Sequence, residues 1–133
     1  NQTEISVPFW NNGPDYTVTW KYDKESNTYK RYHGDTEQID PTTKETLATK
    51  TLIIQFEVER DANDGYPGGH LLYGTTGSGK ALIFSDGKVT EGKWNKASRT
   101  ARSKFTDAKG KEIELNRGRV WIQTIPADNT VDY

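Results

Sequence analysis

Cysteine is absent from this sequence of 133 residues, and so is methionine. Without cysteine the chain forms no disulfide, offers no thiolate nucleophile and cannot build a cysteine-ligated zinc site. Long apolar runs are absent too: a stretch such as residues 81–84 is far shorter than the roughly 20 residues of a membrane-spanning helix. Because the sequence starts with Asn1 and not with methionine, we expect a processed product or an excised domain.

Hydrophobic residues are scarce, at 32% of the chain, against roughly 45–50% in typical globular domains. The aromatic residues, 4 Trp, 7 Tyr and 4 Phe, must therefore supply much of the core, since each ring buries on the order of 150–250 Å². Such a core suits thin sheet packing better than a helical bundle. The 18 basic and 19 acidic side chains give a net charge of −1, so no overall field favours nucleic acid or a membrane surface.

Alternating apolar and polar residues predict β-strands almost throughout the chain. In the longest, residues 51–59, we expect Val58 to share the buried apolar face, while Gln55, Glu57 and Glu59 point to water. No stretch shows the 3.6-residue period of an amphipathic helix. The predicted strands cover residues 17–22, 29–32, 51–59, 81–84, 112–115 and 120–125.

Turn residues separate these strands. Asp86-Gly87 is typical of a type I′ hairpin turn, and residues 107–110 are expected to form another hairpin loop. The pattern predicts one all-β domain over residues 1–133, an antiparallel sandwich or partly open barrel of about eight short strands joined by hairpins. Residues 1–13 and 127–133 are expected to be loosely held ends, although residues 7–10 could dock as an edge strand.

Residues 74–80 read GTTGSGK and match most of a phosphate-binding P-loop pattern. A P-loop needs a helix after the lysine and a Ser or Thr hydroxyl for magnesium, but Lys80 is followed by Ala81 and by a predicted strand. We therefore interpret the stretch as a glycine-rich hairpin or bulge between residues 71–73 and 81–84. It predicts no nucleotide site.

Two histidines and nearby carboxylates leave an enzyme open as the alternative function. His33, Asp35 and Asp40, with His70 further on, could form a metal site or an acid–base cluster of a hydrolase. The spacing is not diagnostic, and polar loop residues around a glycine would show the same pattern. Whether these side chains converge in a cleft decides between the two readings.

A local basic segment is the most distinctive surface feature predicted. Residues 92–106 contain no acidic residue, and the next connection adds further arginines. Such a patch could bind an acidic protein surface or an anionic polymer, although a solvated loop is the simpler interpretation. The candidate binding residues are Lys93, Trp94, Lys96, Arg99, Arg102, Lys104, Arg117 and Arg119.

The order of short motifs along the chain resembles a known family. W-x-Y-D at 20–23 and Y-x-R-Y at 29–32 are followed by Asp40, then by G-x-G-x-A-x-x-F at 77–84 and G-x-W-x-K at 92–96. The run D-x-x-G-K-E-I-x-L-N-x-G-x-x-W-I-x-x-x-P closes the pattern at 107–126. Over residues 15–126 the chain resembles the C-terminal domain of the YerB-like bacterial lipoproteins, a family of unknown function. Where that family has a histidine shortly before the aspartate, this chain has Gln38-Ile39-Asp40.

The resemblance implies an extracytoplasmic protein of mostly Gram-positive bacteria, anchored to the membrane through a lipid on a cysteine outside this sequence. It implies a further N-terminal domain and no enzyme activity. We accordingly expect a non-catalytic binding domain without cofactor, metal or nucleotide, whose partner is a protein, an anionic envelope polymer or its own N-terminal domain. If it chiefly supports that domain, an apolar patch should be exposed on its surface.

Overall fold

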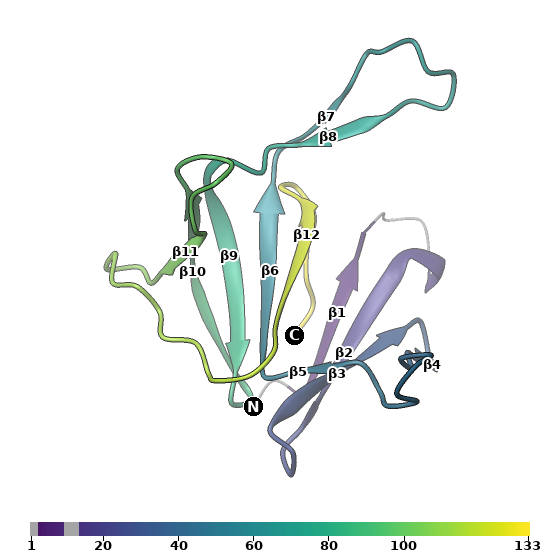
Figure 1. The fold of residues 1–133 in the computed structure, drawn as a ribbon, viewed down its shortest axis with the longest axis vertical. Helices are drawn as coiled ribbons and strands as arrows, with labels where there is room; N and C mark the ends of the chain where they lie inside the picture. Colours follow the sequence, from purple (N-terminus) through teal and green to yellow (C-terminus); the bar gives the residue numbers. More distant parts are fainter. Residues whose placement is uncertain (1–2, 10–13) are drawn as a thin grey trace.

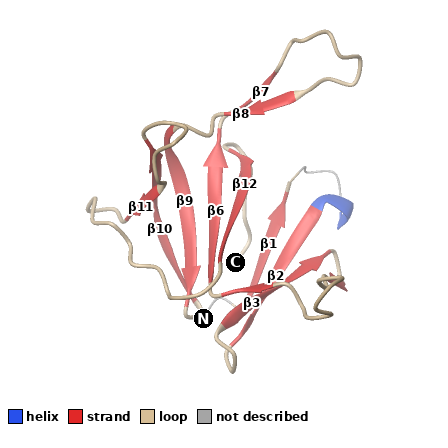
Figure 2. Ribbon diagram, in the orientation of Figure 1, coloured by secondary structure: helices blue, strands red, loops and turns tan. Residues whose placement is uncertain are grey.

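The computed structural model describes residues 3–9 and 14–133, and nearly all of its regular structure is β (Figure 1, Figure 2). The first sheet contains, in spatial order, β1 (Glu4–Pro8), β2 (Thr17–Asp23), β3 (Thr28–His33) and β4 (Thr36–Glu37), with β5 (Ala48–Thr49) also paired to β3. The second sheet contains, in spatial order, β11 (Lys104–Thr106), β10 (Lys88–Lys96), β9 (Gly77–Ser85), β6 (Thr51–Glu57) and β12 (Val120–Pro126). A short 3₁₀ turn, η1 (Pro14–Tyr16), precedes β2. Among the described residues no helix has the length and hydrophobicity to cross a membrane.

The main core lies between the two sheets. Trp20 and Tyr29 from the first sheet are fully buried against apolar side chains of the second, among them Leu52, Phe84 and Ile125. This arrangement confirms the predicted all-β sandwich, and the described strands form no closed barrel. One pairing departs from the antiparallel expectation, because β12 runs parallel to β6.

The second sheet is apolar on both faces. Its outer face carries a smaller cluster that includes Ile53, Ile83 and Phe105, partly covered by the connection from β11 to β12. Strand β6 contributes Leu52, Ile54 and Phe56 to the main core and Ile53 to the outer cluster, so side chains on both of its faces are covered. Gln55 and Glu57, expected to point to water, are accordingly only 6% and 2% exposed. Gln55 Nε2 donates a hydrogen bond to Glu57 Oε1, while Glu57 Oε2 is buried without a hydrogen-bond partner.

The predicted strand over residues 51–59 is also too long. β6 ends at Glu57, and Val58, expected in the core, is 67% exposed. The chain then forms a hairpin of β7 (Glu59–Asp61) and β8 (Leu71–Tyr73), which projects from the body (Figure 1). Nothing in the local alternation marks this break, because the polar–apolar pattern continues through it.

Residues 112–115 do not form the predicted strand. Glu112 makes an isolated bridge to Thr106, and the Ile113 N–H donates to the Phe105 carbonyl at 2.8 Å, after which the chain follows no ladder. The turn before it is as predicted: the Gly110 N–H donates to the Asp107 carbonyl at 3.0 Å. The alternating side chains here cover the outer face of the second sheet without joining it.

The described parts of both chain ends, residues 3–9 and 127–133, make structural contacts, contrary to the expectation of loose ends. Ile5 and Val7 of β1 are fully buried, and β1 pairs with β2 as the edge strand that was considered for residues 7–10; Trp10 lies outside the described residues. At the other end, the Asn129 side-chain amide donates to the carbonyl oxygens of Pro8 at 2.9 Å and Phe9 at 2.6 Å. The two ends therefore hold each other against the core.

The turn between β9 and β10 is as predicted. Asp86 and Gly87 have φ angles of 54° and 69°, as a type I′ turn requires. The Gly87 N–H donates to the buried Tyr29 hydroxyl at 3.0 Å, which ties this turn to the first sheet.

Candidate functional site

The GTTGSGK stretch is mostly strand and not a phosphate loop. β9 begins at Gly77 and runs antiparallel to β10, so a strand occupies the place where a P-loop needs a helix. A Cβ atom on Gly79 would lie 2.6 Å from Trp94 Nε1 and 2.8 Å from the Phe56 carbonyl oxygen. Glycine at this position therefore makes room for the Trp94 indole. The predicted hairpin between residues 71–73 and 81–84 is not formed, because β8 and β9 belong to different sheets.

The side chains proposed for an enzyme are dispersed. His33 Nε2 lies 2.6 Å from the Asp15 carbonyl oxygen, and His33 and Asp35 line one shallow cleft. Asp40 does not line that cleft; its carboxylate accepts from the backbone N–H groups of Thr42 and Thr43 at 2.7 and 3.1 Å, and these bonds lower its pKa. Asp40 thus caps a turn. Within residues 3–9 and 14–133 no three His, Asp or Glu side chains gather as metal ligands.

His70 lies apart from these residues, on the projecting β7–β8 hairpin. Its Nδ1 is 2.7 Å from the Asp64 carboxylate, and its ring stacks on Tyr66 with centroids 4.2 Å apart. The hydrogen bond from His70 lowers the pKa of Asp64. These contacts order the tip of the hairpin.

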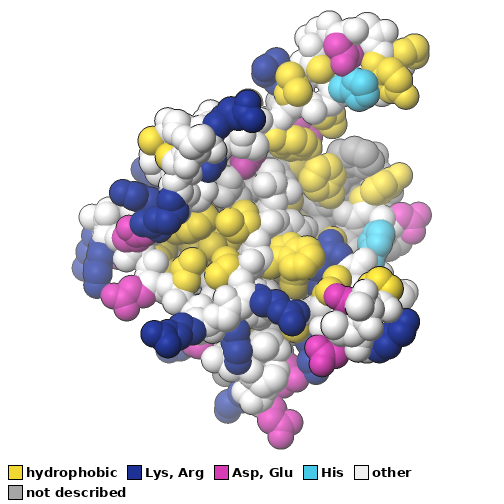
Figure 3. Space-filling model, viewed as in Figure 1, with side chains coloured by type: hydrophobic (Ala, Val, Ile, Leu, Met, Phe, Trp, Pro, Cys, Tyr) yellow, Lys and Arg dark blue, Asp and Glu magenta, His cyan; other side chains and the backbone are white. Residues whose placement is uncertain are grey.

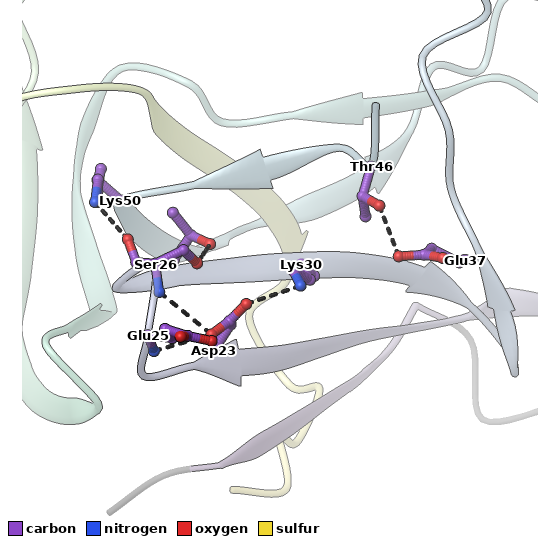
Figure 4. Close-up of polar contacts among 8 residues, drawn as sticks. Asp23, Glu25, Ser26, Lys30, Glu37, Thr46 and Lys50 are labelled. Carbon is purple, nitrogen blue, oxygen red and sulfur yellow. Dashed lines mark hydrogen bonds and ion pairs between the residues drawn. The ribbon is translucent and has the colours of Figure 1, made fainter. Parts of the chain in front are cut away.

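The densest polar contacts of the first sheet surround the β2–β3 turn and are structural (Figure 4). Lys30 Nζ lies 2.8 Å from Asp23, whose carboxylate also accepts from the backbone N–H groups of Glu25 and Ser26. The hydrogen bond from Lys30 is the largest cause that lowers the pKa of Asp23 to about 2. Lys50 Nζ donates to the Ser26 carbonyl at 2.6 Å and joins the turn to the start of β6.

The predicted basic segment is divided between faces of the second sheet. Trp94 pairs with Phe105 across β10 and β11, and both are buried in the outer cluster; Trp94 Nε1 donates to the Phe56 carbonyl at 2.8 Å. Trp94 is therefore a core residue and not a surface contact. Because side chains alternate along a strand, Lys93 and Lys104 point to the opposite face from these aromatic rings.

The remaining cations of the segment are partly engaged. Lys96 Nζ donates to the Ala101 carbonyl, and Arg102 forms an ion pair of 2.7 Å with Glu112 that lowers the pKa of this carboxyl. Arg99 is exposed in the loop between β10 and β11. The structure therefore does not gather these cations into one dense positive surface.

Arg117 and Arg119 precede β12. Arg117 is exposed, whereas the Arg119 carbonyl accepts from the Thr49 hydroxyl at 2.7 Å and from the Lys50 N–H at 3.0 Å. Arg119 lines a cleft together with Thr28 and Ala48 of the first sheet, and its charge contributes to the lowered pKa of Asp40. The two arginines extend the dispersed cationic surface.

An apolar groove opens on the outer face of the second sheet. Leu115, Val120 and Ile122 are 37%, 39% and 45% exposed and border a space of about 950 Å³. Figure 3 shows hydrophobic side chains gathered over this sheet, bordered by Lys and Arg. We call this surface the outer groove; its apolar lining is Phe105, Ile113, Leu115, Val120 and Ile122, and its charged rim is Arg102, Glu112 and Glu114.

The sheet topology and the outer groove define an all-β domain with an apolar surface groove. The model of the C-terminal domain of DUF3048, a protein of unknown function, matches residues 5–122, and the chain belongs to this family.

A crystal structure of the YerB protein from Bacillus subtilis is similar, with a TM-score of 0.81 and 22% sequence identity over 98% of this chain. The chain spans only 43% of that YerB chain. No curated protein matches the sequence. These findings confirm the family resemblance that the motif order indicated.

Proposed function

We propose that the chain is a non-catalytic interaction domain of an extracytoplasmic, lipid-anchored bacterial protein, and that its outer groove binds the N-terminal domain of the same protein. The observation that carries this proposal is the exposed apolar face of an otherwise well-packed sandwich. Leu115, Val120 and Ile122 each keep more than a third of their surface in water. Covering them would contribute about 3 kcal/mol, taking roughly 1.5–3 kcal/mol for each fully buried side chain.

The chemistry of the groove favours a protein over an anionic envelope polymer. Its floor is apolar, Arg102 is already paired with Glu112, and Glu114 adds negative charge at the rim. A polyanion requires converging cations, whereas Lys93 and Lys104 point away from the face that bears the groove. A protein surface with apolar side chains matches the groove better.

The position of the chain start favours the N-terminal domain as the occupant. The Thr3 carbonyl accepts from the Tyr22 N–H at 2.9 Å, and the Tyr22 ring lies against Gly87 in the β9–β10 turn. In the same turn Asp86 accepts from the Asn116 side chain at 2.7 Å, next to Leu115 in the groove. Residues that precede Thr3 in a longer chain would therefore enter near this end of the groove. The family description names a C-terminal domain, and more than half of the YerB chain lies outside the matched region.

The experiment compares the isolated domain with the longer chain that includes the N-terminal domain. Leu115→Asp should leave the melting temperature of the isolated domain nearly unchanged, because Leu115 is partly exposed and outside the core clusters. In the longer chain the same substitution should raise hydrogen exchange of residues 112–122 to the rate seen in the isolated domain. Val58→Asp is the matched control, since Val58 is 67% exposed and does not line the groove.

Equal exchange of residues 112–122 in both wild-type proteins would overturn the proposal. Binding of polyphosphate to the isolated domain, lost when Lys96, Arg99 and Arg102 are changed to Glu, would instead support an anionic polymer as the partner.

A further inference from the structure

A second cleft runs along the free edge of the second sheet. Strand β12 is the last strand of that sheet (Figure 1), and its consecutive residues Trp121, Ile122, Gln123 and Thr124 line a cleft of about 520 Å³ together with Arg31 of β3. Consecutive side chains of a strand point to opposite faces. Four consecutive residues can therefore all line the cleft only if the backbone edge of β12 faces it. We call this space the edge cleft.

The backbone of β12 is available for another strand. β12 pairs with β6 over its whole length, from Val120 opposite Thr51 to Pro126 opposite Glu57. In a parallel pair alternate residues direct both their N–H and C=O groups away from the partner. Among the described residues no further hydrogen bond reaches the backbone of residues 120–125. An extended segment can therefore add to this edge.

Arg31 places an unpaired cation in the same cleft. Its guanidinium carbon lies 5.2 Å from the Trp121 ring centroid and 5.8 Å from that of Trp20. The Arg31 Nε atom is buried without a hydrogen-bond partner, and the ion pairs of the described residues do not include Arg31. Burial lowers its pKa, with no carboxylate to oppose the effect. A half-buried cation without a counter-ion is unfavourable for folding, and a bound carboxylate would satisfy it.

The walls around Arg31 are held in place. Trp20 and Trp121 pack edge to face with centroids 5.3 Å apart, and Trp20 Nε1 donates to Gln123 Oε1 at 3.0 Å. Asp15 and His33 also line the cleft, where His33 Nε2 contacts the Asp15 carbonyl. The cleft thus combines a fixed aromatic wall, an open strand edge and one free guanidinium.

We propose that the edge cleft binds an extended peptide segment that carries one carboxylate. The peptide backbone adds to β12 as a further strand, a carboxylate of an Asp, a Glu or a free C-terminus pairs with the Arg31 guanidinium, and Trp121 contacts a neighbouring apolar side chain. The two clefts share Ile122, but neither Arg31 nor Trp121 lines the outer groove. Because the test uses the isolated domain and changes Arg31, its outcome does not depend on the docking proposed above.

The test uses a displayed library of random peptides, selected on the wild-type domain and counter-selected on the Arg31→Met variant. Methionine keeps an unbranched apolar stem against the two indoles but has no charge. Enriched peptides should contain β-forming residues around a single carboxylate. A synthetic peptide from this set should bind the variant roughly ten- to a hundredfold more weakly, as should its Glu→Gln version on the wild type. Binding should shift the amide resonances of residues 121–125.

The melting temperature distinguishes a peptide-binding role of Arg31 from a role in stabilising the fold. The Arg31→Met variant should melt at or above the wild-type temperature, because an unpaired cation leaves the interior. Lys30→Met is the matched control: it removes one positive charge from the same strand, at a side chain paired with Asp23, and should leave peptide affinity unchanged.

Three results would overturn the proposal: enriched peptides without a carboxylate, equal affinity for wild type and Arg31→Met, or amide shifts that leave residues 121–125 unchanged. Concentration-dependent dimers with protected amides in β12 would assign the edge to a second copy and also refute it. If Arg31→Met fails to fold, the affinities of the Glu and Gln peptides are measured on wild type and on Arg31→Lys. If the affinity losses from the protein change and from the peptide change are additive, the proposed pairing of Arg31 with the carboxylate is refuted.

Discussion

Replacing Gly79 by alanine should destabilise the domain, because the new methyl group would collide with the Trp94 indole. The Cβ atom would lie 2.6 Å from Trp94 Nε1, which is about 0.8 Å inside the 3.4 Å at which ordinary contacts begin. Moving Nε1 away from the new Cβ by that amount would lengthen its 2.8 Å bond to the Phe56 carbonyl oxygen to only about 3.2 Å, because this oxygen itself lies 2.8 Å from the Cβ position. The hydrogen bond is therefore weakened, and the new methyl group also collides with the carbonyl.

The expected loss follows from these two effects. Overpacking against the indole and the Phe56 carbonyl costs about 1–3 kcal/mol, and weakening the Trp94 hydrogen bond costs roughly a further 0.5–1.5 kcal/mol. The lower entropy of the unfolded alanine chain offsets roughly 0.4–1 kcal/mol. We expect a net loss of about 1–3 kcal/mol in the free energy of unfolding, or roughly 5–10 °C in melting temperature.

Urea unfolding of Gly79→Ala measures this loss, and Gly74→Ala is the matched control from the same GTTGSGK stretch. A Cβ on Gly74 would lie 3.7 Å from the nearest atom, the Val58 carbonyl oxygen, which is an ordinary contact. The control should stay within about 1 kcal/mol of wild type. If Gly79→Ala is as stable as Gly74→Ala, the explanation that glycine admits the indole fails.

Two further changes test the packing of the turn and of the chain ends. Tyr29→Phe should cost about 1–3 kcal/mol because the Gly87 N–H loses its acceptor. Burial raises the pKa of Tyr29 from 10.0 to about 12, so its contribution is present below pH 10 and lost as pH rises through 12; alkaline denaturation curves should be flatter in that window for the variant. Asn129→Ala should cost about 1–3 kcal/mol in urea unfolding, since the carbonyls of Pro8 and Phe9 lose their donor; an unchanged value would mean that the C-terminal segment is not held there.

Local chemistry predicted several elements correctly. The alternation in residues 17–22 predicted β2, the apolar run 81–84 predicted the buried part of β9, and Asp86-Gly87 predicted the turn that follows. Each of these depends on neighbouring residues only. The burial of Gln55 and Glu57 could not be predicted in this way, because it depends on the outer cluster that covers the second face of β6.

The candidate sites depend even more on contacts between distant residues. The basic segment was visible as a run of cations, but strand alternation divides it between two faces and places Trp94 in the core. In the sequence, Arg31 is visible only as the arginine of the Y-x-R-Y motif at 29–32, and nothing in its neighbours predicts a binding role. Its role arises from Trp121, which is distant along the chain and is brought to the guanidinium only by the packing of the two sheets.

Residue patterns alone predicted the all-β class, most strand positions and the β9–β10 turn, and the order of the motifs predicted the family. These properties follow from residue periods and turn conformations that act over a few neighbours. Five features could be seen only in the tertiary structure: the parallel pairing of β12, the packed ends, the projecting hairpin, the outer groove and the edge cleft. All of these features depend on which faces and edges of the two sheets are covered by other segments. Because those segments are distant in the sequence, their contacts form only in the folded protein.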